Sequence, residues 1–396
     1  MPASAGIGDD RVMTTSSPGP LALRERALGP DLTRGVMLLL IALANSHYFL
    51  VGEPRRGGFP LDGSTSDAVL RWVVPTFVDG RAYPLFGLLF GYGVAQVVRR
   101  SSPRPPSVVR RILWRRALVL VVVGLVHGLL LYVGDILAAY GVLLFLGAWA
   151  VRWRDGWLLT IGVVMTVMVG LPSEGTLAVS TDGPTPAELP RDLATMLAAR
   201  PPTQVYVALL GPIGFVGPFA LGLWAGRRRV LERPAEHRRL LRVVAVGGLA
   251  AAVVGAQPVA LVLSRLRATP SADTLGVIGP LHDATGVLGG LGYAAALALV
   301  ADRLERSGRS DGRVVQALVA VGRRSMTCYV LQSVVWTLAF TPFLLDLSGR
   351  LSVTSTAVLA LLTWLGTVLV ADRMARRDAR GPLESLVRRV GYGGVR

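Results

Sequence analysis

Two residues that could do chemistry together lie in one of the most apolar stretches of the chain. His127 and Asp135 are eight residues apart in VGLVHGLLLYVGDILAAYGVLLF, residues 123–145. Because Gly134 permits a tight turn and His127 shares a helix face with Leu131, a returning chain can bring Asp135 close to His127. A carboxylate that orients an imidazole is the usual arrangement of a general base. The alternative is a hydrogen bond that only ties two helices together.

Other polar residues inside or beside apolar segments are further candidates, because a charged group within a membrane costs about 2.5–3.5 kcal/mol on insertion scales. Arg34 precedes an apolar segment that contains Asn45, about 16 Å further along a helix. We expect Arg34 near the inner headgroups and Asp135 at an outer interface that water reaches. The remaining candidates for substrate contacts are Asp79, Arg81 and Gln332.

The composition indicates an integral membrane protein. Of the 396 residues, 52% are hydrophobic and only 17% are charged, whereas soluble domains carry about 25% charged residues. Several apolar runs approach the roughly 20 residues that a helix needs to cross a bilayer. A membrane span must be a helix or part of a closed barrel, and these runs lack the alternation of barrel strands. We therefore predict an all-α, polytopic helix bundle.

Ten membrane spans are predicted, and the arginines assign their direction. The spans are 35–52, 83–98, 117–133, 136–151, 157–171, 205–226, 240–263, 276–301, 323–341 and 353–371. With the N-terminus inside, the inner segments hold 33 of the 42 arginines and the outer segments hold 9. Positive residues concentrate in cytoplasmic loops, so we expect both termini in the cytoplasm.

Three parts follow from this topology. They are a cytoplasmic N-terminal segment (1–34), a transmembrane helical domain (35–372) with an extracytoplasmic loop (172–204), and a cytoplasmic C-terminal tail (373–396). Residues 66–78 are expected to form an interfacial helix outside, and residues 314–321 a short apolar helix at the inner surface.

The net charge of +17 points to membrane lipid and not to nucleic acid. All basic residues are arginine and most lie in the inner segments, where anionic lipid headgroups of the cytoplasmic leaflet attract them. The single cysteine, Cys328, excludes an internal disulfide or a cysteine-based zinc site. We expect no bound metal, a location in a bacterial cell membrane, and a packing role for Cys328; a homodimer is left open.

Five stretches in order resemble the YeiB-like family of bacterial membrane proteins, the domain of unknown function number 418. They are PDLTRGVMLLLIALAN, DGRAYPLFGLLFGYG, RRALVLVVVGLVHGLLLYVGDILAAYG, GRRSMTCYVLQS and RGPLESLVRRVGYG. The chain departs from the family pattern at Ala82-Tyr83, Cys328, Ser385 and Val387. The polar residues that the resemblance carries over are Arg34, Asn45, Asp79, Arg81, His127, Asp135, Gln332, Glu384 and Arg388.

The family resembles, at a distance, the transmembrane acyltransferases, which move acyl groups from cytoplasmic acyl-CoA to acceptors on the far side. Many of these carry a histidine where Asn45 stands, so His127 is the better candidate base here. The first hypothesis is transfer from acyl-CoA, held near Arg34, Arg115 and Arg116, to a hydroxyl of a sugar, cell-wall glycan or lipid-linked metabolite.

Two other hypotheses stay open. A transporter or exporter of a small metabolite would use His127 and Asp135 in a polar pathway. In a structural or signalling membrane protein, the same residues would only hold helices together.

Overall fold

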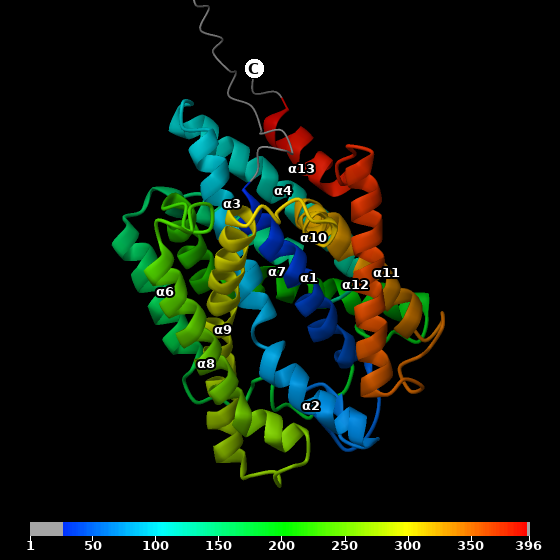
Figure 1. The fold of residues 1–396 in the computed structure, drawn as a ribbon. Helices are drawn as coiled ribbons and strands as arrows, with labels where there is room; N and C mark the ends of the chain where they lie inside the picture. The colour runs from blue at the N-terminus through cyan, green and yellow to red at the C-terminus, as the bar shows by residue number, and fades with distance from the viewer. Residues whose placement is uncertain (1–26, 394–396) are drawn as a thin grey trace, which may run out of the picture.

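The structure, a computed structural model, describes residues 27–393 and is a bundle of helices (Figure 1). The helices that correspond to the predicted spans are α1 (Leu28–Ser46), α3 (Ala82–Arg100), α4 (Pro106–Leu130), α5 (Leu137–Gly147), α6 (Asp155–Val169), α7 (Leu193–Arg227), α8 (Arg238–Leu263), α9 (Ala272–Arg306), α11 (Ser325–Phe340) and α12 (Val353–Arg376). The other elements are η2 (His47–Phe49), β1 (Arg55–Arg56), β2 (Phe59–Pro60), α2 (Thr65–Phe77), η3 (Ala150–Arg152), α10 (Arg313–Arg323) and α13 (Pro382–Tyr392). The two strands pair antiparallel in a short hairpin.

In the described part of the chain, six helical segments are long and apolar enough to cross a membrane. They are Leu28–Phe49, α4, α7, α8, α9 and α12, while α5, α6 and α11 are shorter apolar helices. The chain is therefore a multi-pass helical membrane protein. That all ten predicted segments cross the bilayer stays a prediction. Helices are present where residues 66–78 and 314–321 were expected to form them, as α2 and α10. That they lie at the membrane interfaces stays a prediction.

The segments that the arginine count grouped together meet at one end of the bundle, which we call the arginine-rich end. Figure 1 shows α10 and α13 at this end and α2 at the other, the opposite end. Ion pairs that join the arginine-rich segments are Arg99–Glu232, Arg227–Asp155, Arg238–Asp302 and Arg323–Asp31, with distances of 2.6–3.3 Å. The arginine-rich segments therefore lie together at one end of the fold. That this end faces the cytoplasm stays a prediction.

Glycines on α3 and α7 let these two helices pack in direct backbone contact. Gly91 faces the backbone of Phe219, and Gly222 faces the backbone of Leu88, so a Cβ atom has no room at either glycine. The glycines of α3 therefore form part of its packing face. This contact fixes α3 at the centre of the bundle.

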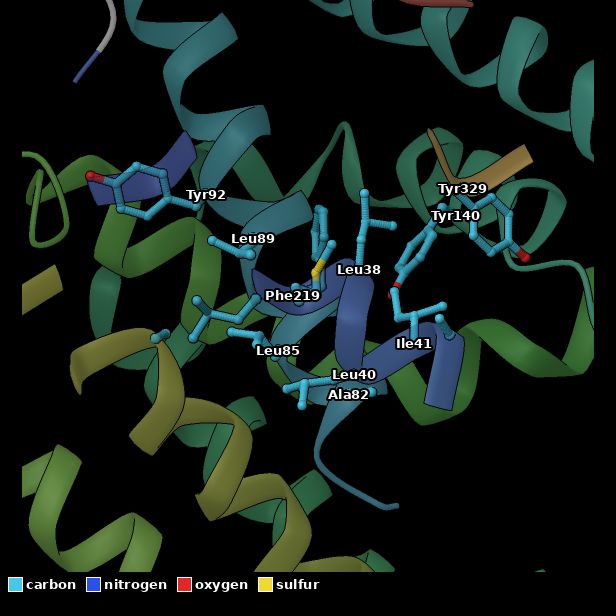
Figure 2. Close-up of a cluster of buried hydrophobic side chains, with 14 of the residues drawn as sticks. Leu38, Leu40, Ile41, Ala82, Leu85, Leu89, Tyr92, Tyr140, Phe219 and Tyr329 are labelled. Atoms are coloured by element: carbon cyan, nitrogen blue, oxygen red, sulfur yellow. The ribbon is translucent and has the colours of Figure 1, made fainter. Parts of the chain in front are cut away.

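The core beside this contact is built from α1, α3, α5, α7 and α11. Figure 2 shows Leu38 and Ile41 of α1 close to Tyr140 of α5 and Tyr329 of α11, while Leu85, Leu89 and Phe219 fill the other side. All of these side chains are buried. Cys328 is also buried and unpaired, as expected of a packing residue.

Some elements extend beyond the predicted boundaries. Helix α1 begins at Leu28 and α7 at Leu193, so both include residues that the sequence assigned to the N-terminal segment or to the outer loop. Residues 382–392 of the predicted tail form the amphipathic helix α13. Residues 1–26, most of the predicted N-terminal segment, lie outside the described residues.

A capping carboxylate joins α2 to α12 at the opposite end. Asp67 accepts hydrogen bonds from the Ser64 N–H (2.9 Å) at the start of α2 and from the Thr354 N–H and hydroxyl (both 2.7 Å) at the start of α12. Burial alone would raise the pKa of Asp67, but the hydrogen bonds from Ser64 and Thr354 hold it well below its usual value. The ionised carboxylate therefore stabilises the contact between two helix N-termini.

We expect Asp67→Ala to lower the free energy of unfolding by about 1–2 kcal/mol at pH 7, because two helix starts lose a hydrogen-bond acceptor. The pKa of Asp67 is depressed in the folded protein. Its contribution to the free energy of unfolding is therefore present above the unfolded pKa of about 4 and is lost as the pH falls below it. Thermal unfolding in detergent measures the effect. Glu174→Ala, at an exposed loop position, is the control; equal loss in both variants would contradict the assignment.

Candidate functional site

The predicted contact between His127 and Asp135 is present at the end of α4. The Nδ1 atom of His127 lies 2.8 Å from Oδ1 of Asp135, and the two side chains are 2% and 0% exposed. The second carboxylate oxygen, Oδ2, accepts a hydrogen bond of 2.8 Å from the Ala138 N–H. Asp135 therefore both orients the imidazole and caps the first turn of α5.

The local sequence explains how the pair forms. Helix α4 ends after Leu130, the turn through Gly134 reverses the chain, and α5 returns along α4. Gly124 on α4 faces the Ala138 N–H and the carboxylate of Asp135, and a side chain at Gly124 would displace both. A glycine one turn before His127 is thus what allows the carboxylate to reach the ring.

The second ring nitrogen of His127 is the reactive feature of this pair. Nδ1 bonds a carboxylate, which only accepts, so Nδ1 carries the proton of a neutral ring and Nε2 presents a lone pair. Nε2 is buried without a hydrogen-bond partner among the described residues. The ring of Tyr329 lies 5.2 Å from the His127 ring, and its hydroxyl is likewise buried and unpartnered.

The expectation that water reaches Asp135 is wrong for this conformation. Asp135 is completely buried and His127 is 3% exposed. The first turns of α7 cover this end of α4, because Arg200 donates to the Leu129 carbonyl (3.0 Å) and Gln204 donates to the Val133 carbonyl. The sequence placed residues 193–204 in the outer loop, so it did not anticipate this cover.

A cavity of about 290 Å³ opens at the arginine-rich end. Its lining is basic near the surface and apolar deeper in the bundle. The arginines that line it are Arg34, Arg100, Arg116, Arg323, Arg324, Arg380 and Arg388, and the apolar lining includes Met37, Phe86, Leu89, Phe90, Leu120 and Leu144. Such a cavity suits an amphiphile with a multiply anionic head and an apolar end.

Helix α13 forms one wall of the cavity and is fixed there by Glu384. This carboxylate accepts hydrogen bonds from the Met326 N–H (2.8 Å), the Thr327 N–H (3.2 Å) and the Thr327 hydroxyl (2.6 Å) at the start of α11. Arg388 lines the cavity one turn further along α13. The family resemblance named both residues without giving them a role. Their place in this wall of the cavity gives them one.

Aromatic side chains lie between the floor of the cavity and His127. The Tyr140 ring lies 4.9 Å from Phe86 and 4.7 Å from Phe90, both of which line the cavity. Tyr140 and Tyr329 are neighbours in the core (Figure 2), and Tyr329 contacts His127. The Tyr140 hydroxyl is also buried without a partner. Sequence analysis did not single out either tyrosine.

A second polar cluster lies at the opposite end, around Arg81. The guanidinium of Arg81 is fully buried and bonds His282 Nε2 (2.8 Å), the Ala252 carbonyl (2.7 Å) and the Asp79 carbonyl. Nε2 of His282 also lies 3.0 Å from the Pro75 carbonyl oxygen, and its Nδ1 lies 3.0 Å from Oδ1 of Asp283. Arg81 therefore fixes the start of α3 against α8 and α9, whatever else it does.

The carboxylate of Asp79 faces this cluster. Its Oδ2 lies 3.6 Å from Nε2 of His47, and its Oδ1 is buried without a hydrogen-bond partner in the described chain. Burial raises the pKa of Asp79 to about 8, with Arg81 opposing the rise and Asp283 adding to it. Asp79 is therefore mainly protonated at pH 7 and can donate a hydrogen bond.

The other predicted substrate residues occupy separate places. Arg34 and Arg116 line the cavity, whereas Arg115 bonds the Gly393 carbonyl outside it. Gln332 is buried and donates to the Leu38 carbonyl (3.1 Å), and its Oε1 has no partner in the described chain. Asn45 is partly buried. Between residues 27 and 393, no group of three His, Cys, Asp or Glu residues could hold a metal ion.

Comparisons with known proteins confirm the family resemblance. Residues 225–394 match the sequence model of the family described as "Protein of unknown function (DUF418)". A Bacillus subtilis (strain 168) protein described as "Uncharacterized protein YxaH" is 23% identical over 413 residues, which cover 95% of this chain and 97% of the relative. The family match covers α8 to α13 and thus the wall built by α13, while the relative also spans His127 and Asp135. Neither description names a reaction.

We expect Asp79→Asn to reduce the pH dependence of stability. The folded carboxyl, with a pKa of about 8, holds its proton where the unfolded one, at about 4, has lost it. The contribution of Asp79 to stability therefore falls as the pH rises from about 4 to 8 and is constant above that range. Melting temperatures at pH 5 and pH 8 measure this difference, with exposed Asp182→Asn as the control. An unchanged slope in Asp79→Asn would contradict the raised pKa.

Proposed function

We propose that the protein is a membrane-bound acyltransferase that moves an acyl group from cytoplasmic acyl-CoA to a hydroxyl acceptor. The observation that carries the proposal is the unpartnered Nε2 of His127, held by Asp135 and linked by aromatic contacts to an arginine-lined cavity. A general base for the acceptor hydroxyl and a site for the anionic head of the donor are two parts that such a transfer requires. The acceptor is a sugar, a cell-wall glycan or a lipid-linked metabolite.

The positions of His127 and Arg116 along α4 agree with a base deep in the bundle and a donor site near its end. Along α4, His127 lies eleven residues from Arg116, about 16 Å further into the bundle. The phosphates of the donor would lie among the arginines, with Arg34 and Arg116 in the cavity and Arg115 at its outer edge. Asp79, Arg81, Asn45 and Gln332 would act from the acceptor side or from the core.

In the proposed step, His127 carries out both proton transfers. Nε2 accepts the proton of the acceptor hydroxyl while the hydroxyl oxygen forms a bond to the thioester carbonyl carbon. The C–S bond then breaks, and the imidazolium returns the proton from Nε2 to the sulfur of coenzyme A. Asp135 stabilises the transient positive charge on the ring through Nδ1. Because His127 is buried, the first turns of α7 must move to admit the acceptor, and Tyr140 and Tyr329 must move to bring the thioester to Nε2.

We also consider transport, since buried polar groups continue from His127 and Asp135 towards the cluster at Arg81. The hydroxyl of Tyr48 interacts electrostatically with Asp79, and both Tyr48 and Asp135 interact with tyrosine side chains of the same core. A polar pathway for a small metabolite would use these groups without forming a product. Uptake into proteoliposomes with no chemical change of any substrate would favour this second function.

We expect His127→Ala to abolish the slow release of coenzyme A that occurs when the purified protein in detergent transfers the acyl group to water, a loss of at least about 100-fold if the histidine is the base. The free thiol can be read with a thiol reagent because Cys328, the one cysteine, is buried. His127→Gln keeps a polar side chain of similar size as a folding control. His237→Ala, in a loop at the arginine-rich end, should retain full activity.

Saturable acyl-CoA binding by all three variants, with release lost only at His127, would support the transferase. A folded natural protein that binds no acyl-CoA, or an active His127→Ala, would overturn it.

A further inference from the structure

The cavity at the arginine-rich end has a defined length because one face of α3 lines it throughout. Residues of α3 that line the cavity recur every three or four positions: Phe86, Leu89, Phe90, Gly93, Val94, Gln96, Val97 and Arg100. Phe86 and Arg100 are 14 residues apart, about 21 Å along the helix axis. The cavity therefore reaches from the basic rim to about two-thirds of the thickness of a hydrocarbon core.

The polarity of the lining changes along this length. At the rim lie arginines of α3, α4, α13 and the junction of α10 and α11. Midway, Arg34 pairs with Asp31 (3.1 Å) and donates to the Leu89 carbonyl (3.3 Å). Only the deepest part is wholly apolar. The basic rim suits a multiply anionic head, and the apolar deep part suits the far end of the same ligand.

Three aromatic rings close the deep end. Phe86 and Phe90 line the cavity and pack against Tyr140 at 4.9 and 4.7 Å, and Phe215 supports Tyr140 from the other side at 4.7 Å without lining the cavity. Tyr140 is completely buried. Because interiors are close-packed, a longer ligand would need these rings to move.

The length of coenzyme A can be compared with this depth. Its arm from the sulfur to the nearest phosphorus contains about thirteen bonds and extends about 15 Å, at roughly 1.2 Å a bond. With the phosphates at the rim, about 5 Å of the 21 Å remains beyond the sulfur, enough for about four carbons.

We propose that Phe86, Phe90 and Tyr140 form a ruler that restricts the donor to short-chain acyl-CoA thioesters of about two to four carbons. The inference rests on the proposed function, since it assigns the cavity to the acyl donor. It adds the class of acyl group and the residues that select it.

The test is displacement of radiolabelled acetyl-CoA from the purified full-length protein in detergent by butyryl-, octanoyl- and decanoyl-CoA. For the natural protein we expect butyryl-CoA to compete like acetyl-CoA and octanoyl-CoA to bind at least about tenfold more weakly, because overpacking of a closed end is costly. Phe86→Ala or Phe90→Ala should bring octanoyl-CoA to within about threefold of butyryl-CoA.

Phe215→Ala is the matched control, since it removes a ring that touches Tyr140 but does not line the cavity. It should keep the chain-length preference of the natural protein. Phe90→Leu serves as a milder variant if Phe90→Ala does not fold, which gel filtration and circular dichroism report; it should shift the preference in the same direction.

The outcomes separate the two proposals. Octanoyl-CoA binding as tightly as butyryl-CoA in the natural protein, or an equal shift in Phe215→Ala, would overturn the ruler and leave acyl transfer intact. Failure of all four thioesters to bind overturns both. Micellar phosphatidylglycerol is the last competitor. If it displaces acetyl-CoA as effectively as free coenzyme A does, the cavity binds an anionic lipid and the ruler is overturned.

Discussion

The fold depends on the cost of placing an unpaired charge in hydrocarbon, which exceeds what a single packing contact returns. Most arginines therefore lie at one end, where ion pairs such as Arg99–Glu232 and Arg323–Asp31 link the segments. Buried arginines at the opposite end, such as Arg81 and Arg200, donate to backbone carbonyls or to a histidine. Each buried charge thus also fixes a helix position.

The same constraint gives the candidate site its character. A buried histidine in the last turn of an apolar helix is stable because Asp135 accepts from Nδ1, and the carboxylate in turn accepts from the Ala138 N–H. This arrangement leaves Nε2 as a lone pair in a dry environment, where electrostatic interactions are stronger than in water. A base of this kind acts only on a substrate that enters the bundle.

Two features of the described conformation limit access to that base. Arg200 and Gln204 hold the first turns of α7 over the end of α4, and Tyr140 with Tyr329 separates the cavity from the imidazole. A bundle that is closed on both sides of its reactive group keeps water away from a thioester until both substrates are present. The closed conformation is therefore compatible with transfer and unfavourable for hydrolysis.

The sequence alone determined the helical membrane class and the grouping of the arginines at one end, and it indicated that a turn could bring Asp135 close to His127. These depend on composition or on residues eight positions apart with a glycine turn between them, where local geometry suffices. Only the tertiary structure decided the burial of Asp135, the cavity wall formed by α13, the Tyr140–Tyr329 link and the bond between Arg81 and His282, which are 201 residues apart. Such contacts follow from how distant helices pack, and no periodicity within one helix encodes its partner.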